Sequence, residues 1–245
     1  MTKTMTRTTP AGDSRLEEAL TSLRAHQTQR DLDNLTRFGI AATNPLGVSM
    51  ANIQKVARSL GRERALAAAL WETEIYEARL LTAYVDDPEQ VTSAQMDSWC
   101  RDFDNWGVCD TLCFSLFDRT PHAWKKVAQW AKKLAEFEKR AAFALLASLA
   151  VHDKHAPDAR FIQCLPIIER AASDERHLVR KGVSWALRTT GRRSDALHHA
   201  AFEVAQRLAG SADPSARWVG KDAVRELSNA VVARQLERKR ASKKR

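Results

Sequence analysis

The chain has 245 residues, with 39 Lys or Arg against 30 Asp or Glu, and a formal net charge of +9 at pH 7. Hydrophobic residues make up 44% and charged residues 28%, which is close to the globular average and excludes wholesale disorder. No apolar run approaches the roughly 20 residues that a membrane-spanning helix needs, and four cysteines are too few for a disulfide framework. We therefore expect a soluble, cytoplasmic protein with no membrane partner.

The charge is distributed unevenly. The tail 234–245 has seven basic residues and one acidic residue. Within the body, the segment 72–104 is strongly acidic, whereas 119–140 and 176–193 are strongly basic. A basic face opposite an acidic one would suit a polyanion, and ordinary solvated helix surface is the competing interpretation.

Capping signals and periodicity predict helices along the whole chain. The expected caps are Gly61, Thr92-Ser93-Ala94-Gln95, Thr120-Pro121, Gly191, Gly210 and Asp213-Pro214. Between them, apolar residues recur at spacings of three and four, as at Leu134, Phe137, Ala141, Ala144, Leu145 and Leu149. No hairpin signal or convincing strand pair is present. The pattern predicts an all-α fold of about a dozen helices.

A weak internal repeat organises these helices. An Ala-rich amphipathic stretch with a leading basic residue begins near Arg79, Arg140, Arg180 and Arg217. The last two intervals are 40 and 37 residues, near the unit of HEAT-type helix pairs. We therefore expect a curved α-solenoid of HEAT-like helix pairs, with a concave groove for an elongated ligand.

The expected domain organisation is simple. A flexible segment, 1–14, precedes a single HEAT-like repeat domain, 15–233. The basic tail 234–245 is expected to be disordered and to add salt-sensitive affinity for DNA.

The first candidate for chemistry is Asp110, the one carboxylate in the apolar stretch NWGVCDTLCFSLF. On a helix it lies one turn after Trp106, so the carboxylate and the indole share a face. An Asp among apolar residues is either part of an ion pair or part of a functional site. A salt bridge to a neighbouring helix is therefore the alternative to a catalytic role.

The second candidate is a stripe formed by Lys181, Trp185 and Arg188, which are spaced by four and three residues. The cations could bind phosphates while the ring meets a sugar or base, although core packing accounts equally well for a Trp. Arg140 is the third element and could instead pair with Glu136 on its own helix. Metal-ligand spacings and phosphate-binding glycine loops are missing from the sequence, so we expect no metal and no cofactor.

Together these motifs resemble the AlkD-like DNA alkylation repair family of HEAT-repeat DNA glycosylases. The resemblance spans roughly residues 35 to 228 and rests on WGVCD at 106–110, FEKRAAFALLASLA at 137–150 and VSWALR at 183–188. It departs from the family at Gly107, where relatives often have Asp.

The resemblance implies an enzyme that acts on duplex DNA. It implies a monomeric, metal-independent glycosylase that grips double-stranded DNA and excises cationic N3- or N7-alkylated purines. Asp110 would be the catalytic carboxylate, with Trp106 and Trp185 against the lesion's deoxyribose. Arg140 and Arg188 would bind the DNA backbone, and Lys181 joins them through its place in the stripe. The alternative is a noncatalytic HEAT-repeat module that binds DNA or a protein partner.

Overall fold

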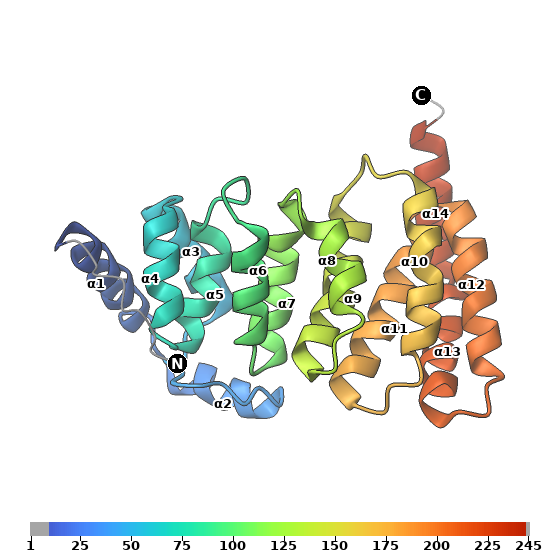
Figure 1. Ribbon diagram of the computed structural model, residues 1–245, viewed down its shortest axis with the longest axis horizontal. Coiled ribbons are helices and arrows are strands. Elements are labelled where there is room, and N and C mark those ends of the chain that lie inside the picture. Colours follow the sequence, from blue (N-terminus) through green and yellow to red (C-terminus); the bar gives the residue numbers. More distant parts are fainter. Residues whose placement is uncertain (1–9, 244–245) are drawn as a thin grey trace. The chain divides into compact units, whose positions relative to one another are not determined.

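The computed structural model describes residues 10–243, and within them every regular element is helical. There are fourteen α-helices in this range, α1 to α14, and one short 3-10 helix, η1 (Figure 1). The all-α prediction is thus confirmed for the described residues. None of the helices described is long and apolar enough to cross a bilayer.

The chain divides into two compact units. The first consists of the residues up to Thr92 together with Asp104–Leu116, and the second of Ser93–Phe103 and Phe117 onward. A single domain over 15–233 stays a prediction.

Helix α5 is the centre of the first unit. All of its residues except Tyr84 are buried, and it contacts α3, α4 and α7. Its mixture of Ala, Leu and Val allows neighbours to approach from several sides at once. The helices of this unit are α1 (Pro10–Arg24), α2 (Gln29–Arg37), α3 (Met50–Leu60), α4 (Arg64–Glu72), α5 (Tyr76–Val85) and α7 (Trp106–Ser115).

Helix α9 has the same role in the second unit. Its residues from Arg140 to Ala150 are all buried, and it packs on α8 and α11. Helix α11 then packs on α13, while α10 packs on α12. The helices of this unit are α6 (Ser93–Arg101), η1 (Phe117–Arg119), α8 (Ala123–Trp130), α9 (Glu136–His152), α10 (Asp158–Ala171), α11 (His177–Gly191), α12 (Asp195–Ala209), α13 (Pro214–Leu227) and α14 (Ala230–Lys243).

Several side-chain contacts between successive helix pairs of the second unit span the same number of residues. Arg140 contacts Leu178, Ser184 contacts Asp222 and Arg188 contacts Glu226, and each pair is 38 residues apart. In the other layer, Arg207 bonds Glu169 at the same separation. The repeat predicted from the sequence is therefore present here, with a unit of 38 residues.

Several of the predicted helix caps are confirmed. Gly61 ends α3 with a φ of +73°, a left-handed backbone that favours glycine. Asp213 caps α13, where its carboxylate accepts the amide N–H of Ala216 and Pro214 occupies the first turn. The start predicted at Thr120-Pro121 is wrong, because α8 begins at Ala123. The Thr120 hydroxyl instead donates to the Phe117 carbonyl at 2.8 Å and closes the turn after η1.

Near both chain ends, the described residues are helical. Of the segment expected to be flexible, residues 1–9 lie outside the described residues and the rest begins α1. Of the tail expected to be disordered, the described part is helical, in α14. The physical reason is an apolar stripe one turn long: Val232 and Leu236 are only 3% and 4% exposed.

Candidate functional site

Helix α7 of the first unit presents Trp106 and Asp110 one turn apart. Asn105 starts the helix, since its side-chain oxygen accepts the Val108 amide N–H at 3.0 Å. The residues on the opposite side, among them Val108 and Leu112, are buried, whereas Trp106 and Asp110 are half-buried. The predicted juxtaposition of the carboxylate and the indole on one helix face is therefore present, with partial access to solvent.

Gly107 lies where the start of α5 touches α7. A Cβ atom at this position would lie 2.5 Å from the hydroxyl oxygen of Tyr76, a residue that is 6% exposed. Burial raises the pKa of Tyr76 above its usual range, and the carboxylates of Glu77 and Asp104 raise it further. The phenol is thus a neutral group that fills the space beside Gly107.

Two carboxylates fix the loops around α7. Asp104 accepts hydrogen bonds from the Thr43 hydroxyl at 2.6 Å and the Asn105 amide at 2.7 Å. Glu77 is fully buried and accepts the backbone N–H groups of Leu46, Gly47 and Val48 at 2.7, 2.8 and 3.2 Å. Sequence reasoning missed Glu77, although an acid within a stretch of buried α5 residues is a detectable signal.

Helix α11 of the second unit carries the predicted stripe. Lys181 is exposed, while Trp185 and Arg188 are half-buried. Trp185 is thus neither fully buried nor fully exposed, and both interpretations of its role, core packing and contact with DNA, stay predictions.

Arg188 belongs to an ion-pair network between α11 and α13. It bonds Glu226 directly and lies 3.3 Å from a carboxylate oxygen of Asp222. Arg192 binds the other oxygen of Glu226 at 3.1 Å, and Ser184 donates to Asp222 at 2.6 Å. Two carboxylates thus offset much of the positive charge that the sequence assigned to a DNA-binding Arg188.

Arg140 lies beneath the start of α11. Only 6% of it is exposed, and its guanidinium donates to the Leu178 carbonyl at 2.6 Å. This bond joins α9 to α11, and a backbone-binding role for Arg140 stays a prediction. Because Trp106 and Asp110 belong to one unit and Trp185 to the other, a joint role of the three also stays a prediction.

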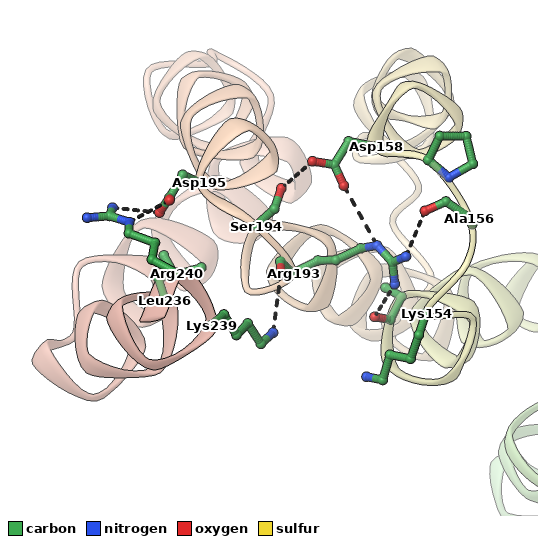
Figure 2. Close-up of a pocket in the computed structure, with 11 residues that line it drawn as sticks. Lys154, Ala156, Asp158, Arg193, Ser194, Asp195, Leu236, Lys239 and Arg240 are labelled. Carbon is green, nitrogen blue, oxygen red and sulfur yellow. Dashed lines mark hydrogen bonds and ion pairs between the residues drawn. The ribbon is translucent and has the colours of Figure 1, made fainter. Parts of the chain in front are cut away.

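A cavity of about 580 Å³ in the second unit is lined by α14 and by the loops that precede α10 and α12 (Figure 2). Its cations already have protein partners. Arg193 donates to the Ala156 carbonyl at 2.8 Å, Lys239 donates to the carbonyl of Arg192 at 2.7 Å, and Arg240 pairs with Asp195 at 2.5 and 2.6 Å. The bonds of Lys239 and Arg240 attach α14 to residues 192 and 195, so the cavity wall is chiefly structural.

Asp118 and His152 form a pair that sequence reasoning did not find. The His152 ring nitrogen Nδ1 lies 2.5 Å from a carboxylate oxygen of Asp118, whose side chain is inaccessible to solvent. Burial raises the pKa of Asp118 above its usual range, partly offset by His152. The two residues are 34 positions apart, so no local pattern could have paired them. Among the described residues no group of three or more His, Cys, Asp or Glu is arranged to hold a metal ion.

Comparison with known proteins places this geometry in context. A family model described as "DNA alkylation repair enzyme" matches residues 19–227. A solved structure described as "A new family of proteins related to the HEAT-like repeat DNA glycosylases with affinity for branched DNA structures" is similar with a TM-score of 0.72 and 16% identity, covering 86% of this chain and 94% of that one. A designed armadillo repeat protein in complex with the peptide (KR)4 gives a TM-score of 0.32 at 13% identity over 92% of this chain and 80% of that one. The search of curated proteins gives no match. The first likeness confirms the predicted α-solenoid of HEAT-like helix pairs.

Proposed function

Because the chain belongs to the DNA alkylation repair enzyme family, we propose that it is a DNA glycosylase that excises cationic N3- or N7-alkylated purines from duplex DNA. The observation that carries the proposal is the pair on α7. A carboxylate and an indole share one helix face and keep partial access to solvent, while the residues beside them are buried.

The chemistry needs little more than this pair. An alkylated purine carries a positive charge, so it leaves as a neutral base with the electrons of the glycosidic bond and needs no protonation. The sugar then develops oxocarbenium character, which the Asp110 carboxylate stabilises electrostatically. The same carboxylate orients a water molecule towards the anomeric carbon. The water's oxygen forms the new bond and its proton passes to solvent.

The tryptophans supply a second source of stabilisation. An indole face attracts a cation, and Trp106 and Trp185 each keep a partly open surface. Against a deoxyribose, either ring would favour the transition state, in which positive charge develops on the sugar, over the ground state, in which the charge lies on the base.

The test is base release from methylated duplex DNA. Wild-type protein and Asp110→Asn are incubated with the substrate, and freed 3-methyladenine and 7-methylguanine are measured. We expect a loss of about 100- to 1,000-fold in the variant, the range typical for removal of one preorganised electrostatic group. Glu72→Gln, an exposed acid on α4 of the same unit, is the matched control and should retain full activity.

A noncatalytic DNA-binding module is the second candidate. The structural neighbour related to these glycosylases is described by its affinity for branched DNA. Binding of DNA by the wild type without release of either base would favour the module and reject the glycosylase.

A further inference from the structure

The beginning of α11 carries a group of cations that differs from the rest of the helix. His177 and Lys181 are exposed, and Arg180 lies between them with its guanidinium carbon 4.6 Å above the ring of Trp218 on α13. The Nε atom of Arg180 is buried and has no hydrogen-bond partner among the described residues. We call His177, Arg180, Lys181 and Trp218 the α11 cation cluster.

The two halves of α11 differ in their acidic neighbours. Near its end, Arg188 and the residue that follows the helix, Arg192, are both paired with Glu226. In its first half, neither Arg180 nor Lys181 forms an ion pair within the described part of the chain. The positive charge of α11 is therefore concentrated near its start.

The acids nearest this cluster do not cancel it. Asp174, just before α11, is held by Arg176 at 2.6 Å and by Lys139 at 3.1 Å. Glu136 of α9 acts on His177, and Arg140 of the same helix opposes it. Cations outnumber acids around His177, and a polyanion is the complementary ligand.

We propose that the α11 cation cluster is a subsite that holds a phosphate of the DNA backbone, and that it, more than Arg188, anchors DNA to the second unit. The contact with the Trp218 ring restrains the Arg180 guanidinium, a group that can donate two hydrogen bonds to one phosphate. Lys181 adds a second charge one position away. The identity of the ligand as DNA rests on the proposed function, whereas the preference for phosphate rests on the cluster.

The subsite has a second consequence, because His177 is a titratable member of the cluster. Burial lowers the pKa of His177, and Lys181, Arg180 and Arg140 lower it further, while Glu136 raises it. A bound phosphate acts in the opposite direction and raises this pKa, so binding takes up a proton. DNA affinity should therefore increase as pH falls through the range between the free and bound pKa values, and this increase should disappear in His177→Gln.

The experiment measures binding of an undamaged duplex by fluorescence anisotropy at several salt concentrations. For Lys181→Gln and Arg180→Gln we expect the slope of log K against log salt to become less steep by about one each, as for the loss of one phosphate contact. Arg188→Gln should change the slope less than either. Arg170→Gln, an exposed arginine on α10, is the charge-matched control and should leave the slope unchanged.

The outcomes separate this proposal from the glycosylase proposal. An unchanged slope in Lys181→Gln, which alters only an exposed side chain, would overturn the subsite, as would an equal effect of Arg170→Gln. Slopes that change as expected in a protein that releases no methylated base would uphold the subsite and reject the glycosylase. Normal base release with unchanged slopes would uphold the glycosylase and reject the subsite.

Discussion

The absence of a side chain at Gly107 leaves the space that the Tyr76 hydroxyl fills. The family resemblance suggested that an acid is missing at position 107, and the structure shows that the hydroxyl of Tyr76 occupies the space such a side chain would need. Glu77, next to Tyr76, is itself committed to three backbone amides. A single substitution at Gly107 therefore cannot restore an acid without displacing the buried ring.

We predict that Gly107→Ala destabilises the protein by about 1–3 kcal/mol, the usual cost of overpacking a filled interior. The added Cβ would also lie 3.2 Å from the side-chain oxygen of Asn105, so the α7 cap is strained as well. Urea unfolding at pH 7 measures the change. The double variant Gly107→Ala with Tyr76→Phe should recover part of the loss, because the clashing oxygen is gone. A double variant with strictly additive losses would show that the two residues do not compete for space.

At the scale of elements, the turn before α11 is the point where three helices of the second unit are joined. Lys139 of α9 binds the carboxylate of Asp174 at 3.1 Å, and Ser215 of α13 donates to its carbonyl at 2.6 Å. Arg176 donates to the same carboxylate from its Nε and Nη2 atoms at 2.9 and 2.6 Å. Asp174 thus links successive helix pairs at their ends, whereas Arg188 and Glu226 link them further along.

We predict that Asp174→Asn lowers the free energy of unfolding by about 1–2 kcal/mol at pH 7, after allowance for its partial exposure to solvent. The hydrogen bonds from Arg176, and then those from Lys139, lower the pKa of Asp174 to about 2. A lowered folded-state pKa gives stability that is complete above the unfolded pKa of roughly 3.9 and is lost as pH falls towards 2. The gap between wild type and variant should therefore narrow from pH 4 downward in urea unfolding experiments. Glu175→Gln, the exposed neighbour, serves as control, and a gap independent of pH would contradict the role assigned to the charge.

At the scale of the whole molecule, much of the net charge of +9 lies in the last twelve residues. The structure assigns two of these cations, Lys239 and Arg240, to contacts that attach α14 to the second unit. Arg234 and Arg238 are exposed. Deleting the tail would therefore remove the buried Leu236 along with the charge and confuse stability with binding.

We predict that the double variant Arg234→Gln with Arg238→Gln lowers the affinity for undamaged duplex DNA at low salt and reduces the salt slope by about one to two. The cause is the loss of two long-range attractions that carry no sequence information. Anisotropy titrations at 50 and 200 mM salt measure the effect. The thermal unfolding midpoint should be the same as that of the wild type. If the wild type and the double variant bind DNA with equal affinity at 50 mM salt, Arg234 and Arg238 are not part of the DNA-binding surface.

Features that depend on neighbours in the sequence were predictable from the sequence alone. The helices, the cap at Asp213, the face shared by Trp106 and Asp110, and the stripe through Trp185 follow from short-range periodicity and local hydrogen bonding. The three motifs sufficed to identify the family, and the repeat intervals near 40 residues anticipated the register of 38.

Tertiary structure decided which charges remain available. Arg188 meets Asp222 and Glu226 across a helix interface, Asp118 meets His152, and Val232 and Leu236 of α14 are buried. The ion pairs join residues tens of positions apart, and their energies depend on distance and desolvation rather than on sequence spacing. The composition of α11 shows that it is basic, but only packing against α13 leaves the charge of its first half uncompensated.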